Sequence, residues 1–238
     1  MRVALLSDAH LQGPGDPNQA RLLRFLAKLE ADRVCLLGDI FQHWWHFGAQ
    51  PFPAYAPVIE ALRRFPLTFV PGNHDFHAAR YFADVLGAEV APEVTAEWDG
   101  VPVHLSHGDE VDRSFGYRAL SATLRGRVFA AGMDHLGPAR AWRFLARISG
   151  HPQGTPDARL CAAQVAVAAA RVTEGHRLVV SGHTHAPGVH PVPGGVYVNL
   201  GDWVRWHTWL LVDGGEATLF RRTDDDRDAP VSALLRAP

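Results

Sequence analysis

The sequence predicts an α/β protein organised around a parallel sheet. Short apolar runs, such as 2–6 and 34–37, alternate with segments whose apolar residues recur at helical spacing, and several runs end in Gly, Asp, Asn or His. Alternating strands and helices are typical of parallel sheets joined by crossover helices. With 238 residues, 47% of them hydrophobic and 20% charged, the chain is expected to be soluble, globular and able to bury a substantial core.

The composition excludes several classes of protein. The formal net charge is −2 with histidine neutral, so the basic excess of a nucleic-acid-binding protein is missing and we expect no nucleic acid partner. Cys35 and Cys161 lie in apolar segments and predict buried thiols in a reducing compartment. No apolar run approaches the ~20 residues of a membrane span, and the first strand leaves no room for a signal peptide. We expect a cytoplasmic protein whose membrane contact, if any, is peripheral.

The first strand and helix bring a carboxylate and an imidazole to one strand end. Residues 2–6 form a short apolar strand that runs into Ser7-Asp8-Ala9-His10, and Asp-x-His in an extended chain places both side chains on one side. A helix is expected over 19–30. The stretch 34–41 then predicts a strand buried on both faces, and the apolar part of this strand is followed by Gly38-Asp39. In open α/β sheets such strand ends line the ligand crevice.

The next strand supplies an amide and a second imidazole. An aromatic loop at 41–47 and a helix at about 55–64 come first, and the loop is expected either to pack on the sheet edge or to form a substrate platform. The strand 67–70 leads into Gly72-Asn73-His74-Asp75, followed by a helix at 76–86. Gly72 permits a sharp turn, Asn73 offers a carbonyl oxygen to a metal, and His74 offers a titratable ring.

Two later strands end in histidine motifs. The strand 101–105 ends in Ser106-His107-Gly108-Asp109, and the strand 178–180 ends in Ser181-Gly182-His183-Thr184-His185. A helix at 157–174 separates them, and further strands follow at 208–212 and 217–220. Five strand ends therefore carry metal-ligand side chains, which an incidental arrangement does not explain.

These five motifs, from Asp8 to His185, resemble the motif set of the calcineurin-like metallophosphoesterases. The resemblance implies a four-layer α/β/β/α sandwich with two metal ions between the strand ends, and Asp39 bridging both ions. By this resemblance one ion is held by Asp8, His10, Asp39 and His185, and the other by Asp39, Asn73, His107 and His183. Carboxylate, amide and imidazole ligands without thiolate suit Mn²⁺, Fe²⁺ or Zn²⁺, and the resemblance favours Mn²⁺. Asp75 and Asp109 are expected to orient ligand imidazoles.

A narrower resemblance concerns the substrate. Gly38-Asp39-Ile40-Phe41 with Trp44 behind it, and Leu200-Gly201-Asp202-Trp203 after a hairpin, resemble the UDP-2,3-diacylglucosamine hydrolases of lipid A biosynthesis. This resemblance implies a lipid-linked nucleotide substrate, cleaved at its pyrophosphate to UMP and 2,3-diacylglucosamine 1-phosphate. It also implies peripheral contact with the cytoplasmic face of the inner membrane. The Leu-Gly-Asp-Trp segment has a plainer interpretation, a tight turn with a core tryptophan.

One departure from that family keeps other reactions open. Its well-known members have arginine at the position of His74. An alkoxide leaving group gains about 10²–10⁴-fold from a general acid such as imidazolium, whereas a phosphate leaving group is already a stable anion. His74 and Asp39 are the expected catalytic residues, for direct attack of water without a covalent enzyme intermediate. The alternatives are a broad phosphomonoesterase or phosphodiesterase, including a protein phosphatase, and a metal-poor binding scaffold. The intact ligand set argues against the scaffold.

The segment 111–156 is surplus to the crossover between the strands ending at His107 and His183. It predicts an inserted lid of two or three amphipathic helices on a single phosphoesterase domain spanning 1–223, and the acidic tail 224–238 is expected to be disordered. Arg143 and Arg147, one turn apart, would meet the diphosphate, while Leu145 and Ile148 lie toward another, apolar face that would meet acyl chains. The alternative is a cap that only packs, or a dimer contact, and the oligomeric state stays open. The full set of expected substrate-binding residues is Asn73, His74, Asp112, Arg143, Arg147 and His183.

Overall fold

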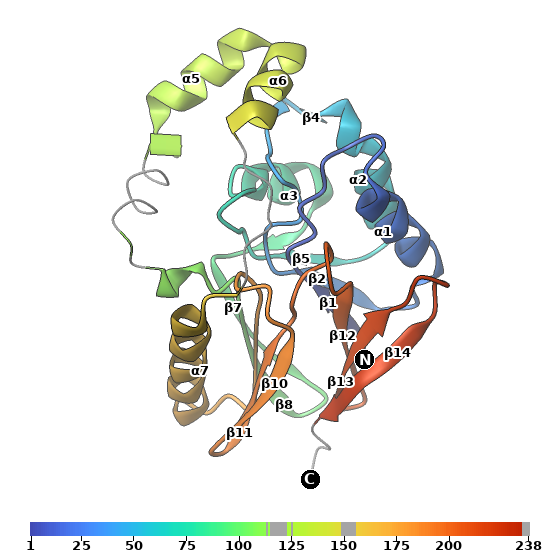
Figure 1. The fold of residues 1–238 in the computed structure, drawn as a ribbon, viewed down its shortest axis with the longest axis vertical. Coiled ribbons are helices and arrows are strands. Elements are labelled where there is room, and N and C mark those ends of the chain that lie inside the picture. Colours follow the sequence, from blue (N-terminus) through green and yellow to red (C-terminus); the bar gives the residue numbers. More distant parts are fainter. Residues whose placement is uncertain (113, 115–122, 125, 149–155, 235–238) are drawn as a thin grey trace.

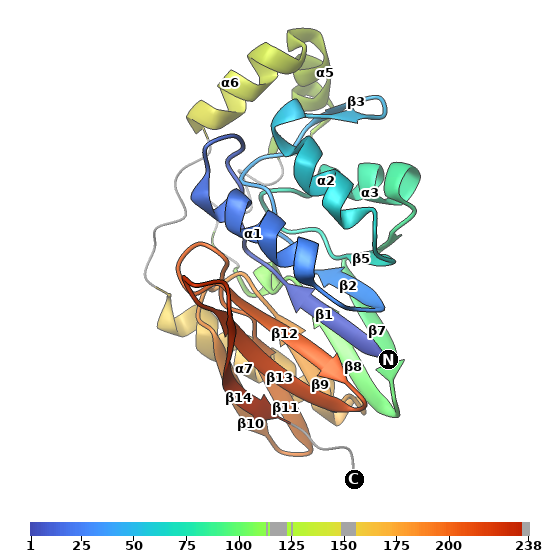
Figure 2. The same ribbon diagram turned by 90° about the vertical axis from the view of Figure 1, so that its right-hand side faces the viewer.

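Two sheets pack face to face between outer layers of helices (Figure 1, Figure 2). The computed structural model describes residues 1–112, 114, 123, 124, 126–148 and 156–234. Among these residues no helix has the length and apolar character needed to cross a bilayer.

The first sheet has seven strands in the order β14-β13-β12-β1-β2-β5-β6. Its parallel part joins β1 to β2, β5 and β6, and the C-terminal strands extend it in antiparallel fashion from β12. The strands are β1 (Arg2–Leu6), β2 (Arg33–Leu36), β5 (Leu67–Phe69), β6 (Glu89–Val90), β12 (Thr208–Asp213), β13 (Glu216–Arg222) and β14 (Asp228–Leu234).

The second sheet has five strands in the order β10-β11-β9-β8-β7. Its three central strands, β11, β9 and β8, are parallel to one another, and the two outer strands are antiparallel. The strands are β7 (Glu93–Trp98), β8 (Val101–Ser106), β9 (Leu178–Ser181), β10 (Gly188–Val192) and β11 (Gly195–Asn199). The edge strand β7 carries no metal-ligand motif and was not predicted from the sequence.

Helices cover the outer face of each sheet. The first sheet is covered by α1 (Pro17–Lys28), by α2 (Ala56–Leu62) after the 3₁₀ turn η1 (Pro53–Tyr55), and by α3 (Ala78–Leu86), while α7 (Ala158–Thr173) covers the second. The start of α1 follows from its sequence, because the Asp16 carboxylate accepts the Asn18 amide and Pro17 occupies the first turn.

Three apolar clusters occupy the three interfaces between these layers. Alternation along β1 shows the division: Ala4 and Leu6 face the helices, whereas Val3 and Leu5 pack against the second sheet. A third, smaller cluster joins the second sheet to α7. The predicted four-layer sandwich is therefore confirmed.

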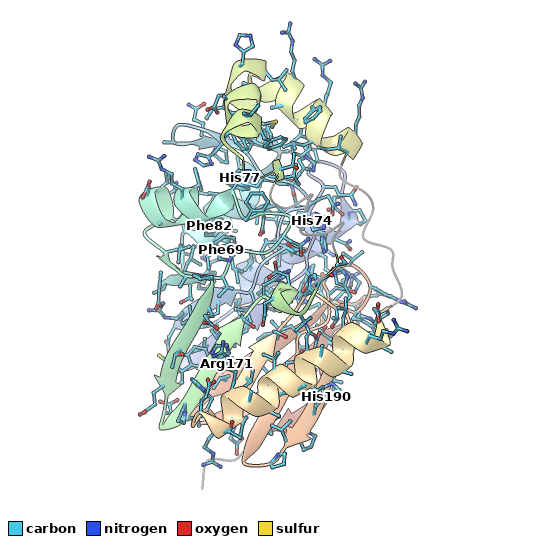
Figure 3. The ribbon with its side chains drawn as sticks, turned by 90° about the vertical axis from the view of Figure 1, so that its left-hand side faces the viewer. Phe69, His74, His77, Phe82, Arg171 and His190 are labelled. Carbon is cyan, nitrogen blue, oxygen red and sulfur yellow. The ribbon has the colours of Figure 1, made fainter. Side chains whose placement is uncertain are left out.

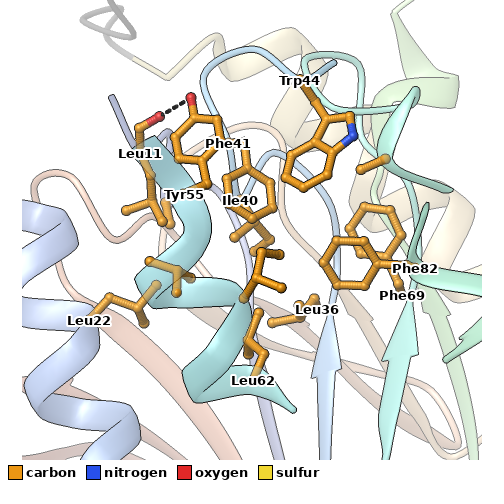
Figure 4. Packing of buried hydrophobic residues seen from close by; sticks show 14 of the residues in the cluster. Leu11, Leu22, Leu36, Ile40, Phe41, Trp44, Tyr55, Leu62, Phe69 and Phe82 are labelled. Atoms are coloured by element: carbon orange, nitrogen blue, oxygen red, sulfur yellow. Dashed lines mark hydrogen bonds between the residues drawn. The ribbon is translucent and has the colours of Figure 1, made fainter. Parts of the chain in front are cut away.

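The aromatic loop after β2 packs into the helix-side core. Trp44 lies parallel to Tyr55 with ring centroids 5.9 Å apart, and Phe69 stacks on Phe82 at 4.2 Å (Figure 4). The Tyr55 hydroxyl donates to the carbonyl of Leu11 at 2.8 Å, which satisfies this buried polar group. Of the two interpretations, packing at the sheet edge describes Phe41 and Trp44, both of which are fully enclosed.

The described part of the inserted segment forms two helices, α5 (Arg127–Leu136) and α6 (Pro138–Ile148). They stand above α3 and above the small hairpin of β3 (His46–Phe47) and β4 (Gln50–Pro51). Met133, Ala141 and Leu145 are buried against the main core, and the Trp45 indole donates to the Asp134 carboxylate at 3.1 Å. Ile148, which was predicted to share the apolar face of Leu145, is 51% exposed. Residues 115–122 and 149–155 of the predicted lid lie outside the described residues.

The acidic tail is not disordered over 228–234, where β14 pairs with β13, so that expectation was wrong for these residues. The mutual repulsion of these aspartates is offset because they form ion pairs with arginines. Asp224 binds Arg21 at 2.9 Å, Asp226 binds Arg24 at 2.7 Å, and Asp228 binds Arg222 at 2.7 Å. The last of these pairs joins the first residue of β14 to β13. Residues 235–238 of the predicted tail lie outside the described part of the chain.

Candidate metal centre

The C-terminal ends of the parallel strands of both sheets meet at one place. The first sheet delivers Asp8 and His10 after β1, Asp39 after β2, and Asn73 and His74 after β5; the second delivers His107 after β8, and His183 and His185 after β9. Figure 3 shows His74 near the middle of the molecule, between the lid and the strands of the second sheet. The five predicted strand ends thus converge although they belong to two different sheets.

The backbone at this junction is strained. Among the described residues eight that are not glycine have positive φ, and five of them are predicted metal ligands: Asp8 (50°), His10 (44°), Asp39 (54°), His183 (68°) and His185 (54°). Left-handed conformations of such residues cost about 1–2 kcal/mol each and persist where the surrounding structure enforces them. Backbone strain concentrated at one set of residues indicates a functional site.

Two glycines let the backbone touch the two central carboxylates. A Cβ on Gly72 would lie 2.2 Å from Asp39 Oδ1, and a Cβ on Gly182 would lie 2.1 Å from Asp8 Oδ2. The His74 amide donates to that Asp39 oxygen at 2.8 Å, and the His183 amide donates to that Asp8 oxygen at 2.9 Å. One oxygen of each carboxylate therefore accepts a hydrogen bond from a backbone amide, and the other oxygen faces the imidazoles.

Those second oxygens meet the ring nitrogens. Asp8 Oδ1 lies 3.2 Å from His185 Nε2 and 3.8 Å from His10 Nε2. Asp39 Oδ2 lies 3.5 Å from His107 Nε2 and 3.9 Å from His10 Nε2. Asp8 Oδ1 is buried without a hydrogen bond, and the two Nε2 atoms of His10 and His185 face each other at 3.1 Å.

This donor set fits divalent cations. Among the described residues, ligand atoms within 4.8 Å of one another form three groups: Asp8 with His10 and His185, His10 with Asp39 and His74, and Asp8 with Asp39 and His107. Asn73 Oδ1 lies 3.2 Å from His107 Nε2, and the rings of His107 and His183 are 5.2 Å apart. Imidazole nitrogens and carboxylate oxygens that face one another are the ligands borderline metals take. Asp8, His10 and His185 of one predicted set group together, and so do Asp39 and His107 of the other, whereas His74, which was not predicted as a ligand, groups with His10 and Asp39. The division into two ligand sets that share Asp39 stays a prediction.

The electrostatics agree with cation binding. Burial lowers the pKa of His10 to about 4, so its ring is neutral, the form that binds metal. Burial opposes ionisation of Asp39, but His107, His74 and His10 together hold its pKa well below the usual range. Burial also opposes protonation of His185, yet Asp8 and Asp202 raise its pKa to about 10. Metal binding must therefore displace protons from such imidazoles.

Backbone carbonyls fix two of the rings. His107 Nδ1 donates to the carbonyl of Leu37 at 2.8 Å, and His74 Nδ1 lies 3.1 Å from the carbonyl of Gln42. In both cases Nε2 is left for the centre. Asp75 was predicted to orient an imidazole, but its carboxylate accepts backbone amides of Asp39–Phe41 and of Gly72 at 2.8–3.3 Å. It therefore ties the loop after β2 to the loop after β5.

Sequence reasoning missed Asp202. Its Oδ2 lies 3.4 Å from His185 Nδ1, and its Oδ1 accepts the amides of Val204 and Trp206 at 2.9 and 3.1 Å. The signal was available, because Gly201-Asp202 follows an apolar strand just as Gly38-Asp39 does, and β11 is parallel to β9.

Asp202→Asn is expected to weaken metal affinity about 10–100-fold, because a partner that orients a ligand imidazole contributes that much. Metal titration of the purified variant checks this, with Asp213→Asn, an aspartate at the exposed end of β12, as the control. Equal affinities of the two variants would show that His185 needs no such partner.

Gln164 on α7 was also missed. Its side-chain amide donates to the carbonyls of Gly182 and Gly108 at 3.0 and 3.3 Å, and its oxygen accepts from Thr184 and Asn199. It thereby braces the two loops that carry the second sheet's histidines. A glutamine inside an alanine-rich helix gives no sequence signal of this role.

The predicted substrate-binding residues fall into two groups. Asn73, His74 and His183 lie at the centre described above. Asp112 follows the 3₁₀ turn η2 (Asp109–Val111), and its carboxylate accepts the Ser114 amide at 2.9 Å. Arg143 and Arg147 are exposed on α6, and Arg143 Nε donates to Ala139 of its own helix at 3.3 Å. The substrate roles of these residues stay predictions.

Residues 1–187 match the sequence model of a family described as calcineurin-like phosphoesterase. The chain belongs to this family. It is 31% identical over 223 residues to a UDP-2,3-diacylglucosamine hydrolase from Nitrosococcus oceani, covering 86% of this chain and 88% of that one. A hydrolase of the same name from Stenotrophomonas maltophilia is 30% identical over 248 residues, covering 92% and 98%.

Solved structures agree on the fold. Vacuolar Protein Sorting 29 from Cryptosporidium parvum superposes with a TM-score of 0.54 at 15% identity, covering 99% of this chain and 98% of that chain. A Vps29 mutant from Entamoeba histolytica gives 0.52 at 15% identity, covering 99% and 100%. The prediction of a metallophosphoesterase hydrolase with buried Asp and His metal ligands is confirmed.

Proposed function

We propose that this metallophosphoesterase cleaves the pyrophosphate of UDP-2,3-diacylglucosamine to UMP and 2,3-diacylglucosamine 1-phosphate. The names of its relatives support this substrate. The structural support is a cleft of about 630 Å³ between α3, α5 and the hairpin that contains β3. Its lining includes Phe76, two residues after His74 in the chain, and the apolar side chains of Trp45, Tyr81 and Ala130.

The cleft suits acyl chains attached to a phosphate at the metal centre. Each buried methylene contributes about 0.8 kcal/mol, so a long chain gains more from this lining than a small aryl ester does. The lining also includes one ion pair, in which Arg80 binds Asp84 at 3.2 Å.

The chain's own residues have distinct tasks in this reaction. Mn²⁺ is the proposed metal, and two such ions activate water and neutralise phosphoryl oxygens when bound. Asp39 supplies the shared carboxylate. His74, whose Nδ1 is held by Gln42, presents Nε2 toward the centre, where it can hydrogen-bond to the leaving phosphate; only for an ester with a basic leaving group would it donate a proton to the leaving oxygen. The uridine-side phosphorus is attacked, so that UMP carries the new oxygen.

The test is an assay of purified protein with Mn²⁺ against UDP-2,3-diacylglucosamine, p-nitrophenyl phosphate and bis(p-nitrophenyl) phosphate. We expect kcat/KM for the lipid nucleotide to exceed both others by at least about 10³-fold, because the cleft adds several kcal/mol of binding. The second candidate is a broad phosphoesterase, which His74 favours because an imidazolium suits alkoxide leaving groups. A higher kcat/KM for either aryl ester would select it.

We also propose that the outer face of the lid meets the membrane that holds this substrate. Five large apolar side chains are exposed among the described residues, and three lie on the lid: Val128 at 89%, Phe144 at 41% and Ile148 at 51%. Arg140, Arg143 and Arg147 are exposed on the same side of α6 as Phe144. Arginines beside apolar side chains suit an anionic bilayer surface.

Changing Arg140, Arg143 and Arg147 together to Gln should weaken binding to phosphatidylglycerol-containing vesicles about 100-fold, since each arginine contributes about 1 kcal/mol near such a surface. Vesicle sedimentation measures this, with Arg159→Gln on α7 as the control. Unchanged vesicle binding together with a raised KM for UDP-2,3-diacylglucosamine would support the diphosphate role of Arg143 and Arg147 instead.

A further inference from the structure

The loop between β11 and β12 carries an aromatic and cationic cluster that the reaction described so far does not use. Two guanidinium groups lie near the half-buried ring of Trp206, with Arg205 at 5.2 Å and Arg221 of β13 at 5.8 Å from its centroid. Both arginines are exposed. Within the part of the chain that the structure describes, neither guanidinium has an ion-pair partner.

This cluster is fixed to the metal centre by one carboxylate. Asp202 Oδ2 faces the ring of His185 at 3.4 Å, while Asp202 Oδ1 accepts the Trp206 amide at 3.1 Å. The amide of Trp203 in the same loop donates to the carbonyl of Asp8 at 3.0 Å. The backbone that carries Arg205 and Trp206 is therefore anchored to the end of the centre that contains His185.

The lining of the cleft assigned to the acyl chains includes Phe76 and His77, which follow His74 closely in the chain. His74 groups with His10 and Asp39, whereas His185 groups with His10 and Asp8. A diphosphate that spans the centre would place its two substituents toward these two ends. If the lipid part extends from the centre toward His74 and the lid, the nucleoside part extends toward His185 and Trp206.

The chemistry of the cluster matches a nucleoside monophosphate. An aromatic face stacks on a nucleobase, and guanidinium groups bind phosphate and ribose oxygens through several donors. Two exposed cations without carboxylate partners favour an anionic ligand. An acyl chain would gain little there, because the arginines would have to be desolvated.

We propose that Trp206, Arg205 and Arg221 form the nucleotide subsite, with the base stacked on Trp206 and the arginines on the ribose and phosphate. This assignment rests on the proposed function, since it divides that substrate between the two ends of the metal centre. Asp202 then has two tasks, because it holds both the metal ligand His185 and the loop that carries the subsite.

The test is a titration of the Mn²⁺-loaded protein with UMP, in which calorimetry measures the affinity. Trp206→Leu should weaken UMP binding about five- to 100-fold, the range for loss of one base stack, and Trp206→Phe should retain most of the affinity. Arg205→Gln and Arg221→Gln should each weaken it several-fold. Arg64→Gln is the matched control, because Arg64 lies 5.5 Å over Phe65 in a similar pair on another surface.

Three outcomes distinguish this subsite from the proposed function. If Trp206→Leu binds UMP within about twofold of the natural protein, or if the natural protein binds no UMP, the subsite is wrong even when UDP-2,3-diacylglucosamine is cleaved. If UMP binding depends on Trp206 but the lipid nucleotide is not cleaved, the subsite stands and the lipid substrate is wrong. Inhibition of aryl ester hydrolysis by inorganic phosphate reports the metal centre separately, and an equal loss of phosphate and UMP affinity in Trp206→Leu would also overturn the subsite.

Discussion

Asp39→Asn is expected to remove bound metal and to lower phosphoesterase activity by about 10³-fold or more, since the charge stabilisation supplied by a divalent ion amounts to several kcal/mol. Asp39 is the one residue common to both predicted ligand sets. Its Oδ2 lies within 3.9 Å of two ligand imidazoles, and its Oδ1 is already bonded to the His74 amide. Asparagine keeps the shape and that hydrogen bond but loses the charge.

Elemental analysis of the purified variant and its kcat/KM for an aryl phosphodiester are the measurements. Asp99→Asn is the matched control, because Asp99 also has a left-handed backbone (φ 50°) but lies in a turn between β7 and β8. A variant that lost activity while retaining the metal content of the natural protein would remove Asp39 from the ligand set. A fall in thermal stability alone would leave Asp39 in the ligand set, since the control separates folding from metal binding.

The sequence predicted this centre because its signals are local. A buried strand shows as a short apolar run, and the residue after it must lie at the sheet edge where parallel strands end. Asp39, His107 and His183 each follow such a run after one or two intervening residues. Their convergence needed no knowledge of which sheet each strand joins.

Other features depended on tertiary contacts and could not be predicted. The role of Gln164 arises only when α7 packs against the second sheet. The aspartates just before β14 pair with Arg21 and Arg24 of α1, about two hundred residues away in the sequence, and only the fold brings them together. On α6 the periodicity correctly placed Arg143 and Arg147 on one face, but periodicity cannot tell which end of an apolar face runs out into solvent, as Ile148 does.

His74→Ala is expected to keep both metals but to lose activity in a way that depends on the leaving group. For phosphodiesters with poor, basic leaving groups we expect a loss of about 10²–10⁴-fold, the contribution of a general acid. For p-nitrophenol, and for a pyrophosphate, the loss should be much smaller because the leaving anion needs no proton. Values of kcat/KM across a series of aryl esters measure this slope.

His74→Arg separates the two roles that this position can have. Arginine supplies charge but no transferable proton, because it stays protonated. If His74 acts as the acid, His74→Arg should recover pyrophosphate cleavage but not the esters with basic leaving groups. Equal losses across all leaving groups in His74→Ala would indicate charge stabilisation alone. Loss of metal in His74→Ala would instead make this ring a ligand, as its grouping with His10 and Asp39 within 4.8 Å permits.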